Sequence, residues 1–510
     1  MKQAGLWLLT GMLLFAAASC GGPADEGPVL VTLEEPDSPF VAIAVWVRAG
    51  SQNDPAGKEG LASLTADLLA EGSTQELAYS DILSRLYPMA TRYEASVDKE
   101  MTVFQGTVHR DNLEEFYALL RDAVLRPGFR PEDFERIKQE HVNYVERMRR
   151  FSSDEELGKE LLYREIFRGT PYEHPVEGYV KSVKSLELAD VQDFYRRYYV
   201  RNNIVVGVGG GYPAGFPERV RQDFATLPRG EVVQPPRPQP QPVEGIHALI
   251  VEKQTKATAI SLGFPIAVTR SDADFWPLFV ANSWLGEHRN SASHLYQVIR
   301  ETRGMNYGDY SYIEAFPMGH RRNLPPVNVS RRSQIFQIWI RPVSMLRPGD
   351  LHDRALFATR AALRELRRLV EQGLTAEEFE TTRNFLRNYT VNYGSTLSRR
   401  LGYALDDLFY GLQPEGFLAQ IPKALEALKA DEVNAAVKRH LQADNFWIVF
   451  ITEDAEGLKQ KLLSGAETPI QYPTEKPAEV LEEDREIQKY PIPIREENIR
   501  IVPVEQVFEE

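Results

Sequence analysis

The chain has 510 residues, of which 43% are hydrophobic and 10% aromatic. At about 150 residues per domain this length gives three or four domains, and the composition excludes wholesale disorder. Lys and Arg number 59 against 73 Asp and Glu, so the formal net charge is −14 and the basic face of a nucleic-acid binder is not expected. A single Cys excludes intrachain disulfides and zinc sites built from several thiolates, whereas nine His remain as possible ligands.

The amino terminus predicts export and a lipid anchor. The apolar stretch Leu6–Ala18 is shorter than the roughly 20 residues that cross a bilayer, but it fits the core of a secretion signal. Small residues precede Cys20, as in a bacterial lipoprotein signal. We expect residues 1–20 to be a signal peptide, Cys20 to be lipidated, and the body to lie in the bacterial cell envelope, facing the periplasm or the exterior. The alternative is an ordinary cleaved signal with an incidental Cys.

Residues 21–228 predict a first mixed unit of strands and helices. The expected strands are Val41–Arg48, Glu100–His109 and Asn203–Gly209, and the expected helices are Gly60–Gly72, Asp111–Leu125, Pro131–Phe167 with a break near Ser152, and Ala189–Tyr198. Gly207, Gly209, Gly210 and Gly211 lack the spacing of a nucleotide-binding loop and predict a turn.

After a Pro-rich segment, residues 229–245, which predicts a stiff linker, the pattern restarts in residues 246–465. The expected strands there are Ala248–Glu252, Ala259–Phe264, Tyr307–Ile313, Gln334–Val343 and Phe446–Ile451, with helices at Asp272–Leu285 and within Leu351–His440. Residues 466–510 form a tail rich in Pro and Glu, whose short apolar runs predict docking on the body or on a partner.

The two units look like copies of each other. Pro131–Phe134 matches Ala376–Phe379 at an offset of 245, and the strand that starts at Asn203 matches the one that starts at Asn445 at an offset of 242. The pattern therefore predicts an α+β fold made of two duplicated mixed halves.

The segment Gly60–Ser73 resembles the helix that carries the inverted zinc motif, H-x-x-E-H, in the pitrilysin/insulinase family of metallopeptidases. The frame continues with Pro171–Pro175 and with the Tyr198-Tyr199 pair before a strand, and the resemblance covers about residues 30 to 455. It implies that the two halves form one side of a clamshell-type peptidase chamber.

The zinc-binding residues of that family are replaced in this chain. The family uses two His one helical turn apart as zinc ligands and a Glu before the second His as general base. These positions hold Ser63, Ala66 and Asp67, and the remaining ligand position, about 77 residues further on, holds Tyr144. The resemblance therefore predicts no catalytic zinc on this polypeptide. Asp67 and Glu71, four residues apart, could hold a hard cation, although a solvated carboxylate pair is the simpler interpretation.

A second family motif is kept. Ser293–Asp309 resembles the helix that ends in an Arg and is followed seven residues later by a Tyr, here Arg300 and Tyr307. In the family this pair faces the zinc across the chamber, and both side chains can donate to a carbonyl oxygen that gains charge in the transition state. The alternative is a buried Tyr beside an Arg300 that pairs with Glu301 or Glu314.

The other histidines predict structural roles. His288 and His294, with Glu287, could be imagined as a metal cluster, but their spacing does not place them on one helix face. A loop-to-helix junction is the expected structure there. His109 at a strand end and His174 in a loop are expected to be structural.

The resemblance implies the second subunit of a two-subunit bacterial metallopeptidase. Such a chain binds no cofactor itself, contributes Arg300 and Tyr307, and depends on a zinc-bearing partner subunit for the hydrolysis of peptide substrates. A structural or peptide-binding protein without a proteolytic role is a second possibility. A third is an autonomous enzyme that uses Asp67, Glu71 and a His from elsewhere.

Overall fold

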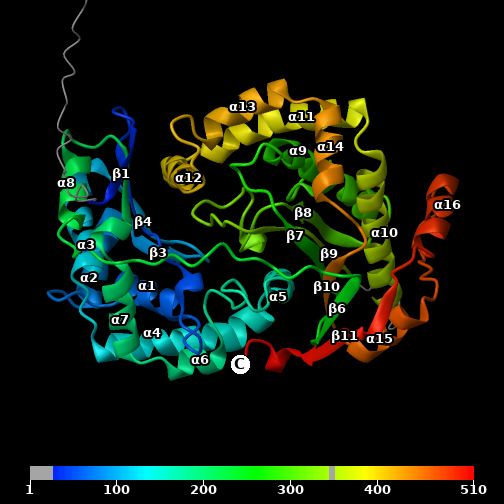
Figure 1. Ribbon diagram of the computed structural model, residues 1–510, viewed down its shortest axis with the longest axis horizontal. Coiled ribbons are helices and arrows are strands. Elements are labelled where there is room, and N and C mark those ends of the chain that lie inside the picture. The colour runs from blue at the N-terminus through cyan, green and yellow to red at the C-terminus, as the bar shows by residue number, and fades with distance from the viewer. Residues whose placement is uncertain (1–26, 344–350) are drawn as a thin grey trace, which may run out of the picture.

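The computed structural model describes residues 27–343 and 351–510, apart from the side chain of Tyr307. The predicted signal peptide and Cys20 lie outside the described residues. Figure 1 shows two lobes built around separate sheets, with the N-terminal lobe in blue to green and the C-terminal lobe in green to red. The extended residues 229–244 carry no helix or strand and pass from one lobe to the other.

The first sheet has the strand order β1-β5-β2-β4-β3. Its strands are β1 (Val29–Glu34), β2 (Phe40–Val47), β3 (Tyr93–Val97), β4 (Thr102–His109) and β5 (Ile204–Gly210). β1 and β5 are parallel, and the other neighbours are antiparallel. The three strands expected from their apolar runs are confirmed, whereas the more exposed edge strands β1 and β3 were not predicted, since they carry few buried residues.

The helices of the first half are α1 (Leu61–Glu71), α2 (Tyr79–Leu86), α3 (Leu113–Leu125), α4 (Pro131–Asn143), α5 (Asp154–Ile166), α6 (Val180–Ser185), α7 (Leu188–Tyr198) and α8 (Phe216–Phe224). All of them except α5 and α6 contribute buried residues to the core on one face of this sheet. Helix α1 begins where the carboxylate of Asp54 accepts the backbone N–H groups of Gly60, at 2.8 Å, and Ala62, at 2.7 Å. Gly60 has φ 98°, a left-handed conformation that suits glycine.

The second sheet repeats the first and adds one strand. Its order is β11-β6-β10-β7-β9-β8, so β6 to β10 take the positions of β1 to β5. The strands are β6 (Ile246–Glu252), β7 (Ala259–Ile266), β8 (Asn306–Tyr312), β9 (Gln334–Pro342), β10 (Phe446–Thr452) and β11 (Ile494–Pro503). The parallel pair β6–β10 corresponds to β1–β5, and the duplication predicted from the sequence is confirmed.

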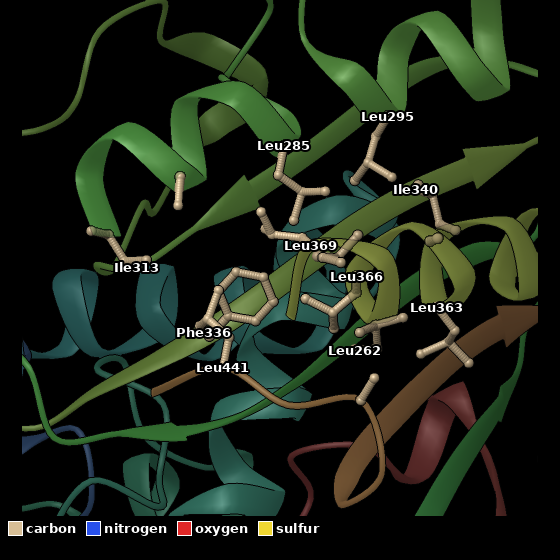
Figure 2. Close-up of a cluster of buried hydrophobic side chains, with 14 of the residues drawn as sticks. Leu262, Leu285, Leu295, Ile313, Phe336, Ile340, Leu363, Leu366, Leu369 and Leu441 are labelled. Carbon is tan, nitrogen blue, oxygen red and sulfur yellow. The ribbon is translucent and has the colours of Figure 1, made fainter. Parts of the chain in front are cut away.

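The second half has a large apolar core between its sheet and its helices. The helices are α9 (Phe275–Gly286), α10 (Leu351–Gln372), α11 (Ala376–Tyr389), α12 (Leu397–Tyr410), α13 (Phe417–Ala427), α14 (Ala430–His440) and α15 (Ala455–Ser464). Figure 2 shows Leu363, Leu366 and Leu369 of α10 turned toward Leu262 and Phe336 on the sheet. Such i, i+3 spacing produces an apolar stripe on one side of a helix.

One helix of each half packs on the sheet of the other half. It covers the face of that sheet that lies away from the sheet's own main core. Leu157 and Leu161 of α5 pack with residues of β6, β7 and β10, while Leu401 and Leu405 of α12 pack with Ala42, Ala44 and Val205 of the first sheet. Both exchanged helices lie between the two lobes (Figure 1). The cores of the two halves are therefore completed by each other.

This exchange explains the glycines that were predicted to form a turn. The prediction is wrong for Gly207, Gly209 and Gly210, which belong to β5. A Cβ on Gly207 would lie 3.2 Å from Leu401 Cδ1, and one on Gly209 would lie 3.2 Å from Leu397 Cδ1. Glycine in this strand lets α12 approach the sheet closely.

The tail docks on the body, as predicted. After α16 (Ala478–Ile487), β11 extends the second sheet by parallel pairing with β6. The last residues then reach the first half, where Phe508 is completely buried and its carbonyl accepts the N–H of Val180 at 2.9 Å. Arg150 Nε donates to the carbonyl of Val507 at 2.7 Å. Within the described ranges, no helix has the length and apolar character to cross a bilayer.

Candidate functional site

The degenerate zinc motif lies on α1, close to α4. Ser63 and Ala66 are buried, and Asp67 keeps 34% of its side chain exposed. Asp67 Oδ2 lies 2.6 Å from Nε2 of His141, which projects from α4 and is buried. The residue of α4 that meets the motif helix is therefore His141, one turn before Tyr144.

The Asp67–His141 pair changes the protonation of the imidazole. Burial lowers the pKa of His141, but the hydrogen bond with Asp67 and its negative charge outweigh burial, so the pKa of His141 is raised. Tyr144 lies further along the chain, and the guanidinium of Arg149 is 5.5 Å from the centre of its ring. The spacing along the sequence pointed to Tyr144 and not to His141. Residues one helical turn apart lie on the same face of a helix, so the spacing did not distinguish between them.

The residues at this position do not fit a zinc ion. Catalytic zinc takes three protein ligands and a water, whereas Ser63 and Ala66 supply neither imidazole nor carboxylate. Asp67 and His141 bond directly to each other, so their lone pairs are not arranged around a common centre. In the described part of the chain, no group of three or more His, Cys, Asp and Glu is placed to hold a metal.

Glu71 does not complete a cation site with Asp67. Its carboxylate is on the exposed side of α1, one turn after Asp67. Burial and the negative charge of Asp67 raise the pKa of Glu71, so the two carboxylates repel each other. Arg136, from α4, lies close and opposes this effect.

Arg300 lies at the start of the segment that leads into β8. It belongs to a short π-helical turn, Tyr296–Glu301, which is anchored in the core by Leu295 and Ile299. The position of Leu295 in this core is visible in Figure 2. The guanidinium of Arg300 lies 4.7 Å from the centre of the Tyr296 ring. Such π-turns inside helices are frequent at functional sites.

Tyr307 follows in β8, at a position whose side chain lies outside the described part of the structure. The pairing of β8 with β9 is irregular between Asn306 and Asp309, which places Tyr307 within the irregularity. Glu314, the alternative partner considered for Arg300, pairs with Arg270 at 2.9 Å.

Asp309 was not identified from the sequence, although it is close to Arg300. It is completely buried, and its carboxylate accepts a hydrogen bond from the side chain of Asn306. Burial raises the pKa of Asp309 to about 8, while Asn306 and the charge of Arg300 oppose this shift. A buried carboxyl with a raised pKa marks a candidate functional position.

The Glu287, His288 and His294 cluster does not form. His288 bonds through its two ring nitrogens to the hydroxyl of Tyr312, at 2.8 Å, and to the carbonyl of Arg322, at 2.9 Å. His294 instead pairs with Glu365 at 2.6 Å. The junction between α9 and the following turn is therefore structural, as expected.

His174 is likewise a structural residue. It is buried, with Nδ1 2.8 Å from the carbonyl oxygen of Pro175. Burial, followed by the charge of Lys99, lowers the pKa of His174 to about 4.

Comparisons with known proteins agree with this geometry. The family model described as Insulinase (Peptidase family M16) matches residues 29–179, and the model described as Peptidase M16 inactive domain matches residues 185–386. Together they cover the first half and much of the second. The chain therefore belongs to the insulinase family of peptidases, M16.

The relatives include proteins named as proteases and one named as a non-peptidase. An uncharacterized zinc protease of Mycobacterium leprae is 29% identical over 304 residues, which are 59% of this chain and 67% of that protein. The alignment with an uncharacterized zinc protease of Mycobacterium tuberculosis spans 62% of that protein, less than two thirds of its length. A protein of Helicobacter pylori named non-peptidase homolog is 21% identical over 461 residues, 89% of this chain and 99% of the relative.

A solved structure confirms the fold. The crystal structure of a peptidase M16 inactive domain from Pseudomonas fluorescens matches with a TM-score of 0.70 and 21% identity, covering 84% of this chain and 96% of that one. The chain is thus an M16 family member with two M16-like halves, and its sequence contains no H-x-x-E-H zinc motif.

Proposed function

We propose that this chain is the subunit without zinc of a two-subunit M16 peptidase, and that it contributes Arg300 and Tyr307 to a site whose metal is bound by a partner subunit of the same family. The partner supplies zinc, which activates water and polarises the peptide carbonyl when bound there. The substrates are peptides or unfolded segments. The lipid on Cys20 anchors the complex to a membrane of the cell envelope.

The observation that carries this proposal is the Asp67–His141 pair. A chain that had recently lost activity by a single change would keep most of its ligands in place, whereas here Ser63, Ala66 and Asp67 all depart from the motif and the last is bonded to a buried imidazole. The relationship to a named non-peptidase homolog over nearly its full length supports the same interpretation.

In this proposal, Arg300 and Tyr307 give the chain a direct role in the catalytic step. Donors aimed at the oxygen that gains charge during water attack lower the barrier, and loss of one such donor typically slows the reaction by about 10²–10³-fold. Arg300 is held by the buried residues Leu295 and Ile299 on a defined turn. Such preorganisation is required of a side chain that stabilises a transition state.

Native purification tests the proposal most directly. The chain is isolated with its binding partners from detergent-solubilised envelopes, and the co-purifying chains and bound metals are identified. We expect an M16 chain with an intact H-x-x-E-H motif at one-to-one stoichiometry, zinc on that chain, and peptide cleavage only by the pair. An isolated chain that holds stoichiometric zinc and cleaves peptides alone would contradict the proposal.

The anchor is tested separately with Cys20→Ser. Incorporation of labelled palmitate into the wild-type chain, and its loss in the variant, is the expected result. Unchanged labelling, or recovery of the wild-type chain as a soluble unlabelled protein, would contradict the anchor without affecting the partner.

A further inference from the structure

A cavity of about 150 Å³ lies between the two halves. Asp98, Arg149 and Tyr163 line it from the first half, and Arg322, Arg331 and Gln337 line it from the second. Arg149 also lies over the ring of Tyr144, and the charge of Glu177 on the cavity wall contributes to the raised pKa of His141, so the cavity is close to the altered motif. A single buried water needs about 10–15 Å³ by this measure, so the cavity has room for a group of several heavy atoms.

Most charged groups on the cavity wall already have partners. Arg331 binds both carboxylate oxygens of Asp98, at 2.6 and 2.7 Å, and Arg149 pairs with Glu177. Lys159, another residue of the wall, pairs with the neighbouring Glu155 at 2.5 Å. These pairs give a counterion to three of the four cationic side chains that line the cavity.

The carboxylates on the wall are satisfied as well. Besides Asp98 and Glu177, the wall contains Glu156 and Glu160. Glu156 accepts the backbone N–H groups of Met318, at 2.7 Å, and Gly319, at 2.8 Å. Glu160 pairs with Lys99 at 3.5 Å.

Arg322 remains as the cation without a counterion. Within the described ranges of the chain, its guanidinium makes no hydrogen bond or ion pair, although its side chain is accessible to solvent. Burial and then the charge of Arg399 lower the pKa of Arg322, while Glu156 acts in the opposite direction. Arg399 itself donates to the carbonyl oxygens of Tyr393 and Pro325. These partners are neutral, so they do not serve as a counterion for Arg322.

Two further atoms on the wall can bond to a ligand. Gln337 is 1% exposed, and its Oε1 has no hydrogen-bond partner among the described residues; the same is true of Nε of Arg149. A buried acceptor and a buried donor without partners are costly unless a bound group satisfies them. A peptide group offers the complementary N–H and carbonyl oxygen.

We propose that this cavity binds the carboxyl-terminal end of a peptide, with Arg322 binding the α-carboxylate and Gln337 and Arg149 contacting the last peptide group. A guanidinium binds a carboxylate through two parallel hydrogen bonds, which suits a chain end better than an interior peptide group. The inference rests on the proposed function, because peptides are the substrate class assigned there. It adds that peptides are held by their free carboxyl end beside the altered metal site.

Calorimetric titration of the purified chain with a matched set of peptides tests the inference. The set consists of one hexapeptide that contains a single internal Glu, in free-acid and C-terminally amidated forms, and the free acid with that Glu replaced by Gln. We expect the free acid to bind at least about tenfold more tightly than the amide, and the Glu to Gln replacement to have little effect. Arg322→Gln should reduce the affinity for the free acid to that for the amide.

Arg321→Gln is the matched control, since Arg321 is adjacent and exposed but does not line the cavity. Equal binding of acid and amide, or of neither, would overturn the inference. Loss of binding on Glu to Gln replacement alone would also overturn it, since it would show that a side-chain carboxylate is recognised. These titrations need no partner, so their failure is distinguishable from failure of the proposed function, which concerns cleavage by the pair.

Discussion

Asp67 and His141 meet across α1 and α4 at 2.6 Å, on the helix that the sequence resemblance assigns to the altered zinc motif. The two side chains form a hydrogen-bonded pair that joins the two helices. Its contribution to stability depends on the charge of His141, because the raised pKa means that the folded state favours the imidazolium.

The first prediction concerns this pair and pH. A raised pKa in the folded state adds stability that is fully present below the unfolded pKa of about 6.5 and is lost as the pH rises through the folded pKa. We expect Asp67→Asn to lower the free energy of unfolding by about 1–2 kcal/mol at pH 5.5, a modest value because Asp67 is 34% exposed, and by less at pH 9. Urea unfolding at both pH values measures the difference.

Glu135→Gln serves as the control, since Glu135 is an exposed residue of α4, the helix that carries His141. Its effect should stay within about 0.5 kcal/mol at both pH values. An Asp67→Asn effect that grows toward pH 9 would show that the pair does not stabilise through a charged His141.

The second prediction concerns zinc. Ser63, Ala66 and the paired Asp67 give no ligand set, so the purified chain dialysed against zinc should retain far less than one equivalent. Elemental analysis measures this, and addition of a chelator should leave the melting temperature unchanged. Stoichiometric retention with a chelator-sensitive melting temperature would refute it.

The third prediction concerns catalysis by the reconstituted pair. Arg300→Ala and Tyr307→Phe should each lower kcat by about 10²–10³-fold, because each removes one donor to the transition state. Complex formation, followed by analytical ultracentrifugation, should be unchanged. Glu301→Gln, at the exposed position next to Arg300, is the control and should retain activity. Full activity of both donor variants would disprove the role of the pair.

The fourth prediction concerns the carboxyl-terminal residues. Phe508 is completely buried among residues of α5 and its neighbours, so Phe508→Ala should lower the free energy of unfolding by about 3–5 kcal/mol. Val391→Ala, at a position that is 76% exposed, should have an effect below about 0.5 kcal/mol. Chemical denaturation of both variants compares them, and equal effects would mean that the tail contributes no packing.

Much of the fold follows from local patterns in the sequence. The strand β2 has an apolar residue at almost every position because both of its faces are covered, and the spacing of Leu61, Leu64 and Leu68 identifies α1. The repeated starts of α4 and α11, and of β5 and β10, predicted the duplication. These patterns can be recognised from the sequence because each depends only on residues within one helix or strand.

Relationships between distant elements could not be predicted in the same way. An apolar stripe shows that α5 and α12 must be covered, but not that each is covered by the sheet of the other half. The role of Gly207 and Gly209 becomes clear only when Leu401 and Leu397 are seen against them. His141 and Asp309 are similar cases, since their meaning depends on Asp67 and Arg300, which approach them in three dimensions.

The exchange of α5 and α12 has a consequence for how a substrate reaches the interior. Swinging the lobes of this chain apart would strip Leu157 and Leu161 from one sheet and Leu401 and Leu405 from the other, exposing apolar surface to water on both sides. We therefore expect the lobes to move as one rigid body. In the two-subunit peptidase that we propose, a peptide would then enter when the whole chain tilts away from its partner subunit, at the interface between the two polypeptides.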